Sequence, residues 1–149
     1  MTDIRFYHLK TMTADQALPQ ILGKATQGGR HVVVKVGNAA MLERLNEYLW
    51  TYRPDSFLPH GTDKDGFAEK QPVFLTAGDD NPNQADILIL TDGAVANDVS
   101  AFAMCCEMLD ERFPDHIAAA RERWKQYQDD GHSVTYWQQT PTGGWEQKS

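Results

Sequence analysis

The sequence predicts a single α/β domain with a mainly parallel central sheet. Its 149 residues are 41% hydrophobic, which is enough for one domain with a core of its own. Short runs of branched and aromatic residues alternate with longer segments whose apolar residues repeat at helical spacing. One of these runs, Arg30–Val36, has a continuous β-branched centre, as in a strand buried on both faces. The order strand, helix, strand, helix from the N-terminus favours a parallel sheet with helices packed on it.

The first helix carries a specific start signal. Thr13 and Gln16 have the spacing of a capping box, in which each side chain bonds to the backbone of the other residue. A helix is therefore expected to start near Thr13. Pro19 complicates this prediction because proline is best tolerated at the first helical position, and it suggests that the regular part begins near Leu18.

The other elements follow from the same two periodicities. The expected strands are Ile4–Leu9, Arg30–Val36, Pro72–Ala77, Asp86–Thr91 and Ser133–Gln138. The further expected helices are Ala39–Tyr52, Val99–Leu109 and Asp115–Gln128. One domain is expected to cover residues 1–149, with the segment from about residue 140 to residue 149 flexible.

The charge balance argues against a protein that binds nucleic acid directly. The chain has 14 Lys and Arg against 21 Asp and Glu, a net charge of −7, which repels phosphate backbones unless the positive charge is concentrated. No apolar run is long enough to span a bilayer, and the N-terminus lacks the basic and then apolar layout of a secretory signal. A soluble, cytoplasmic protein without membrane contact is expected.

No pattern typical of a catalytic, metal or cofactor site stands out. The glycine patterns of dinucleotide-binding loops and P-loops do not occur. Cys105 and Cys106 are adjacent, too close for an unstrained disulfide and too few for zinc, so both are expected to pack, reduced, inside the helix Val99–Leu109. One alternative stays open, a small α/β enzyme with a site around His60 and the turn that begins at Asp92.

A basic segment in the last expected helix is the first candidate binding site. Residues 121–125 (RERWK) carry a local charge of +3 − 1 = +2, against −7 − 2 = −9 for the rest of the chain. Arg121 and Lys125 share a helix face, with Trp124 beside them. Two cations next to an indole can hold a carboxylate while the ring packs on an apolar group, which favours an acidic peptide end as ligand. Two alternatives stay open: a helix that buries Trp124 in the core, and a direct binder of single-stranded nucleic acid.

An aromatic cluster near the second expected helix is the other candidate. Trp50 lies near the end of that helix, and Phe57 lies in a loop bounded by prolines. An exposed cluster of this kind would serve as the hot spot of a protein interface. The alternative is that both rings pack on their own domain.

Several short segments between Ile4 and Trp145 occur in a characteristic order. They are FYHL, a helix ending in LW, SFLPHG, QPVFL, DILIL-TDG, AARERWKQYQDDG and YWQQ-TPTGGW. Together they resemble the family of chi subunits of bacterial DNA polymerase III. The most specific part of the likeness is SFLPH followed by ARERWK, in this order and at this chain length.

The resemblance implies a non-catalytic accessory subunit of the clamp-loader complex, with the DNA-directed DNA polymerase activity in other subunits. It implies one Rossmann-like, three-layer α/β domain with no nucleotide site, cofactor or metal. The implied partners are the psi subunit, the acidic C-terminal tail of the single-stranded DNA-binding protein, and a helicase-like repair protein that uses much of the psi surface. Contact with nucleic acid is then mostly indirect, and the cytoplasmic protein is associated with the nucleoid through the replisome.

Carried over by position, the resemblance also implies roles for single residues. It places Trp50 and Phe57 at the psi interface, and it assigns tail binding to Arg121, Trp124 and Lys125. Trp124 stands where some members have tyrosine, so the ring is kept and a phenolic hydroxyl is lost. The tail bound by this family is acidic and ends in an apolar ring beside a free carboxylate. A short tail is expected to bind in the micromolar range, about −8 kcal/mol.

Overall fold

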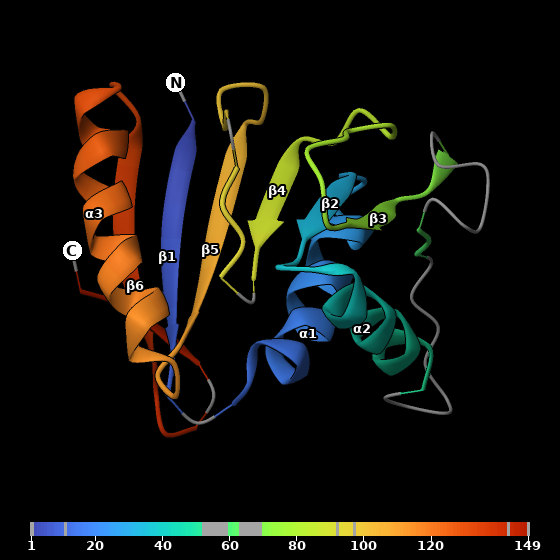
Figure 1. The fold of residues 1–149 in the computed structure, drawn as a ribbon, viewed down its shortest axis with the longest axis horizontal. Coiled ribbons are helices and arrows are strands. Elements are labelled where there is room, and N and C mark those ends of the chain that lie inside the picture. The colour runs from blue at the N-terminus through green and yellow to red at the C-terminus, as the bar shows by residue number, and fades with distance from the viewer. Residues whose placement is uncertain are drawn as a thin grey trace.

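Seven strands form one sheet in the computed structural model, which describes residues 2–10, 12–51, 60–62, 70–91, 93–96, 98–142 and 144–148, the side chain of Trp50 excepted (Figure 1). The strands are β1 (Asp3–Leu9), β2 (Val32–Lys35), β3 (Val73–Thr76), β4 (Ile87–Leu90), β5 (Met104–Asp110), β6 (Ser133–Gln139) and β7 (Trp145–Gln147). The helices are α1 (Ala14–Gln27), α2 (Ala39–Thr51) and α3 (Pro114–Asp129). The strand order is β3-β2-β4-β5-β1-β6-β7, and every pairing is parallel except that of β6 with β7. The predicted α/β class with a mainly parallel sheet is confirmed.

Helices cover both faces of the sheet, as the three-layer prediction requires. On one face, α1 and α2 pack on alternate strand residues such as Val32 and Val34. On the other face, α3 packs on Phe6 and Leu109, which belong to a second core cluster. Because both faces are covered, every residue of β2, β3 and β4 is buried. None of the described helices is long and apolar enough to cross a membrane.

The capping box predicted for α1 is confirmed, and the later start near Leu18 is wrong. The backbone N–H of Gln16 donates to Oγ1 of Thr13 over 3.2 Å, and the N–H of Thr13 donates to Oε1 of Gln16 over 3.0 Å. The helix begins at Ala14 and runs through Pro19, whose ring is buried. The two cap bonds hold the first turn, and the Pro19 ring packs in the core. The helix therefore tolerates the loss of the backbone N–H that proline lacks.

We expect Thr13→Ala to lower the free energy of unfolding by about 1 kcal/mol, because it removes the side-chain acceptor of the cap. Denaturant unfolding measures this change. The matched control is Thr51→Ala, at an exposed threonine in the last turn of α2 whose hydroxyl donates to the backbone carbonyl of Glu47. Equal losses in the two variants would show that the cap does not stabilise the fold.

The helix predicted over Val99–Leu109 is wrong, because Met104–Asp110 forms strand β5. A short run of apolar residues cannot be assigned to a strand or a helix by periodicity alone. Here the parallel pairing of β5 with both β1 and β4 decides the outcome, since it places the run at the centre of the sheet. Cys105 and Cys106 are free and buried as predicted, but they lie in a strand and face opposite core clusters. Burial raises the pKa of the Cys106 thiol to about 12, which keeps it protonated at neutral pH.

The last strand, β7, is an element that the sequence does not predict. Its residues pair antiparallel with the end of β6, where Trp145 lies opposite Gln139. The Trp145 ring meets the ring of Tyr7 edge-on, with 4.7 Å between centroids. Aromatic packing therefore supports this edge strand. The flexibility expected after about residue 140 stays a prediction.

Candidate functional site

A pocket of about 410 Å³ lies between α3 and the face of the sheet that this helix covers. Strands β1, β5 and β6 supply its floor, and α3 supplies one wall. The lining residues are Phe6, His8, Leu109, Ile117, Ala120, Arg121, Trp124 and Tyr136. Most of these side chains are apolar or aromatic, and a few polar groups lie among them. This composition suits an apolar ligand group with a small number of polar contacts.

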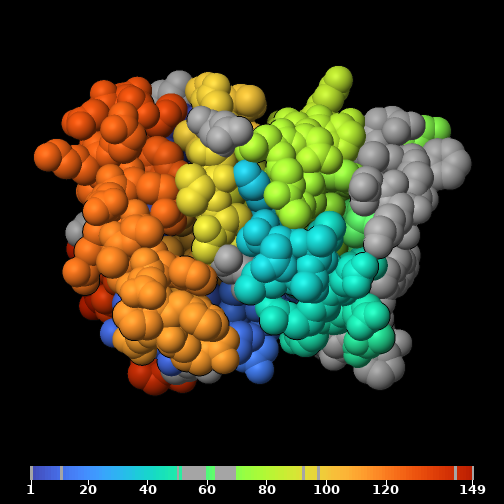
Figure 2. All heavy atoms as spheres, viewed as in Figure 1, coloured from blue at the N-terminus to red at the C-terminus, as the bar shows by residue number. Residues whose placement is uncertain are grey.

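Trp124 forms part of this pocket and is only partly buried. Its ring packs on Phe6, with 5.3 Å between ring centroids, at the edge of the second core cluster. The rest of the ring lines the pocket, on the helix that forms one end of the molecular surface in Figure 2. The alternative that the helix buries Trp124 in the core therefore holds only in part, because the indole packs on the core cluster and also offers an apolar surface to a ligand.

Arg121 and Lys125 lie one helical turn apart on α3, and both are exposed. Arg121 lines the pocket, whereas Lys125 follows Trp124 just outside the lining. Neither takes part in an ion pair within the part of the chain that the structure describes. Both charges are therefore available to a carboxylate from another molecule.

Arg123, counted with the other cations in the sequence, faces inward and is neutralised inside the protein. Its Nη2 lies 2.5 Å from Oε1 of Glu107, and its Nε donates to Oε2 of the same carboxylate over 3.0 Å. The hydroxyl of Tyr127 donates to Oε2 over 2.8 Å. Glu107 is only 1% exposed, so this arrangement anchors α3 to the centre of the sheet. Of the three cations in residues 121–125, Arg121 and Lys125 therefore stay available beside the pocket.

His8 and Tyr136 are pocket residues that the sequence reasoning missed. Nδ1 of His8 is hydrogen-bonded to the hydroxyl of Tyr136, and Nε2 lies 3.7 Å from Oε1 of Glu111. Burial lowers the pKa of His8 below its usual value, although the nearby Glu111 acts in the opposite direction. One signal could have found His8, because the period of two in the first strand places it on the same face as Phe6.

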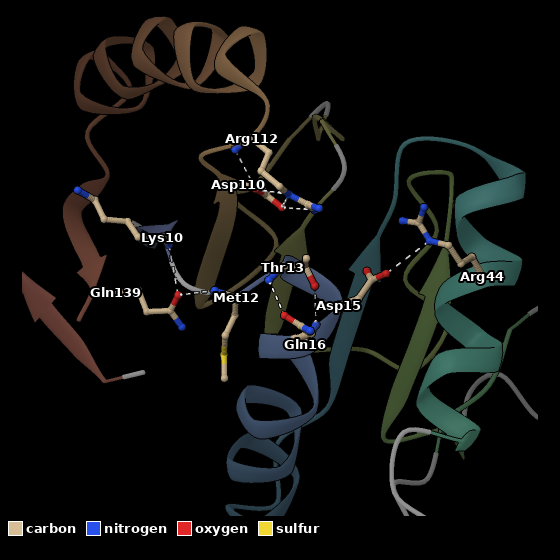
Figure 3. Close-up of polar contacts among 9 residues, drawn as sticks. All are labelled: Lys10, Met12, Thr13, Asp15, Gln16, Arg44, Asp110, Arg112 and Gln139. Atoms are coloured by element: carbon tan, nitrogen blue, oxygen red, sulfur yellow. Dashed lines mark hydrogen bonds and ion pairs between the residues drawn. The ribbon is translucent and has the colours of Figure 1, made fainter. Parts of the chain in front are cut away.

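The carboxyl ends of the parallel strands, where α/β folds commonly bind ligands, carry charged side chains that pair with one another. Nη2 of Arg112 lies 2.7 Å from Oδ2 of Asp110, and Nε of Arg44 lies 3.4 Å from Oδ2 of Asp15 (Figure 3). The side-chain oxygen of Gln139 accepts two backbone N–H groups from the segment before α1. These contacts join the turns at this edge of the sheet.

Of the other predicted site residues, the structure describes the side chain of His60 alone. His60 is 3% exposed, and its Nε2 lies 3.4 Å from the carbonyl oxygen of Asn46 in α2. Asp92, its partner in the enzyme alternative, lies outside the described residues. Phe57 also lies outside them. Trp50 occupies the predicted position near the end of α2, but its side chain is not among the described groups.

Comparison with known proteins identifies the family of the chain over most of its length. The family model described as DNA polymerase III chi subunit, HolC, matches residues 1–135. The chain is 26% identical to DNA polymerase III subunit chi of Pseudomonas aeruginosa over 137 residues, which cover 90% of this chain and 94% of that protein. It is 30% identical over 90 residues to a probable DNA polymerase III subunit chi of Rickettsia prowazekii, a match that covers 60% of this chain and spans 54% of that relative. The chain therefore belongs to the family of DNA polymerase III chi subunits, which are accessory subunits in DNA replication.

Proposed function

We propose that this protein is a non-catalytic subunit of the clamp-loader complex that joins the psi subunit to the acidic C-terminal tail of the single-stranded DNA-binding protein. The observation that carries the proposal is the pocket beneath α3, where an apolar lining adjoins the exposed cations Arg121 and Lys125. The bridge would hold the replicase at template that is coated with the single-stranded DNA-binding protein.

The chemistry of the pocket matches a peptide end that is both apolar and negatively charged. An apolar terminal ring would pack on Trp124 inside the pocket, while its carboxylate would meet Arg121 at the rim. Acidic residues that precede the ring would meet Lys125. Each charge-assisted hydrogen bond contributes roughly 1.5–3 kcal/mol, and salt in solution reduces its charge component. Such a tail would bind in the micromolar range and exchange as synthesis moves along the template.

Direct binding of single-stranded nucleic acid has less support. Affinity for a phosphate backbone depends on the number of phosphates that cations neutralise. The net charge of −7 repels such a backbone. Only two exposed cations flank the pocket on α3, because Arg123 is paired with the buried Glu107. The enzyme alternative gains no support from His60, which is buried and lies against a backbone carbonyl.

A capture experiment tests the proposal. The immobilised protein is incubated with native cell extract that contains either the full-length single-stranded DNA-binding protein or a version without its last residues. We expect retention of the full-length form only, since the tail supplies the ligand. Equal retention of both forms would contradict the proposal. Binding of bare single strands at physiological salt would favour the nucleic-acid alternative instead.

The psi interface is tested by Phe57→Ala, which we expect to abolish co-purification of psi while tail binding is kept. The physical reason is that truncating a central aromatic anchor typically removes 2 kcal/mol or more, roughly, of binding free energy. The helicase-like repair protein is proposed to use much of the same surface, so its binding should also weaken. The matched control is Phe113→Ala, at a phenylalanine that is 45% exposed beside α3. Loss of psi in both variants, or in neither, would contradict this interface.

A further inference from the structure

We propose that His8 is a proton-dependent second cation of the pocket beneath α3, which takes up a proton when a ligand carboxylate lies beside Arg121, so that acidic peptide ends bind more tightly as the pH falls. This inference rests on the proposed function. It adds a residue and a pH dependence to the binding site.

The position of His8 in the fold places its ring in the pocket. It shares the α3 face of β1 with Phe6, and both residues line the pocket together with Arg121 of α3. The His8 side chain is only 12% exposed. A charge in the pocket therefore acts on this ring through a medium that screens less than bulk water.

Several charged and polar groups act on the His8 ring. From the neighbouring elements, the groups that face it are Tyr136, Glu111, Asp110, Lys10 and Arg121. Burial, Lys10 and Arg121 disfavour the protonated ring, whereas Glu111 and Asp110 favour it. The net result is a pKa below the usual value, so the neutral form of the ring is favoured while the pocket is empty.

The contacts of the ring are compatible with a proton on both nitrogens. The Tyr136 hydroxyl can donate to a neutral Nδ1 or accept from a protonated one, since a hydroxyl does both. On the other side, Nε2 lies 3.7 Å from the Glu111 carboxylate, which would face an N–H of the imidazolium. Both protonation states are therefore accommodated without a change of rotamer.

A bound carboxylate would shift the balance toward the protonated ring. At the pocket rim it would offset the charge of Arg121, one of the groups that disfavour protonation. The pKa of His8 is then higher in the complex than in the free protein. By linkage, the additional affinity is fully present below the pKa of the free protein and is lost as the pH rises through the pKa of the complex.

Calorimetric titration at several pH values tests the inference. The probe is a synthetic peptide with the C-terminal residues of the single-stranded DNA-binding protein from the same organism. Between about pH 8 and about pH 5.5 we expect the affinity of the wild-type protein to rise about threefold to tenfold. Titrations in buffers with different ionisation enthalpies should show net proton uptake by the complex.

The variant His8→Gln is expected to lose both the rise in affinity and the proton uptake, whatever its affinity at high pH. The control is His31→Gln, at a ring that bonds to the backbone carbonyl of Asn83 outside the pocket lining, and it should keep both. If His8→Gln does not fold, the imidazole NMR signal of His8 in the wild-type protein gives the answer, because its pKa should rise when peptide is added.

The outcomes separate this inference from the proposed function. A peptide that binds wild-type protein with the same affinity at every pH, or a His8→Gln variant that keeps the pH dependence, overturns the role of His8 only. Absence of peptide binding at any pH overturns the proposed function and this inference together.

Discussion

Replacing Arg123 with methionine is expected to lower the free energy of unfolding by about 3–5 kcal/mol, because it leaves a buried carboxylate without its cation. The carboxylate of Glu107 is 1% exposed and accepts hydrogen bonds from Arg123 and Tyr127. The tyrosine hydroxyl alone cannot neutralise it. Denaturant unfolding followed by circular dichroism measures the loss.

A matched control lies half a turn away on the same helix. Arg121→Met introduces the same substitution at an exposed arginine without an ion pair among the described residues, so we expect a change within about 0.5 kcal/mol. In the double variant Arg123→Met with Glu107→Leu, much of the lost stability should return, because no unpaired charge remains. Similar stabilities for Arg123→Met and Arg121→Met would contradict the assigned burial and pairing of Glu107.

For binding of the tail peptide, Arg121 is the arginine whose substitution should have the large effect. Arg121→Ala should weaken the tail peptide by about tenfold to a hundredfold, the equivalent of one charge-assisted hydrogen bond. Arg121 is exposed, unlike Arg123, and it lines the pocket beneath α3. Isothermal titration calorimetry with the tail peptide measures the loss, and Arg30→Ala, at an exposed arginine just before β2, serves as the control. Undiminished affinity in Arg121→Ala would refute the assignment.

The same interaction predicts a salt dependence for the wild-type protein. Added salt screens exposed charges, so the affinity for the acidic tail should fall steeply as the ionic strength rises. The residual affinity in Arg121→Ala should depend less on salt, since one of the charges is gone. An affinity that does not respond to salt would show that apolar packing on Trp124 dominates the contact.

Most of the fold could be predicted because its elements carry unambiguous local signals. The capping box at Thr13 fixes the start of α1, and the β-branched run in Arg30–Val36 contains the fully buried strand β2. Strand β5 could not be predicted, because its short apolar run fits a helix equally well until the partners on both sides are known. Strand β7 consists of three residues whose pairing depends on β6 alone.

The residues of the candidate site also divide into those that local spacing predicts and those that only the folded sheet brings together. Arg121, Trp124 and Lys125 lie within one turn of a helix, so helical spacing alone places them together. His8 and Tyr136 are 128 residues apart in the chain and meet only because β1 and β6 pair in parallel, which no local pattern reveals. The inward direction of Arg123 also depends on Glu107, which lies in β5, a segment whose sequence favours a helix.

The central claim is that an acidic peptide end binds in the pocket beneath α3, and NMR mapping of the isotope-labelled protein with the tail peptide tests it most directly. The four tryptophan indole N–H groups report on separate parts of the chain. We predict that the signal of Trp124 moves on titration, together with the backbone signals of Ile117 and Arg121, while the indole signals of Trp137 and Trp145 stay in place. A Trp124 signal that remains unchanged at saturating peptide would contradict it.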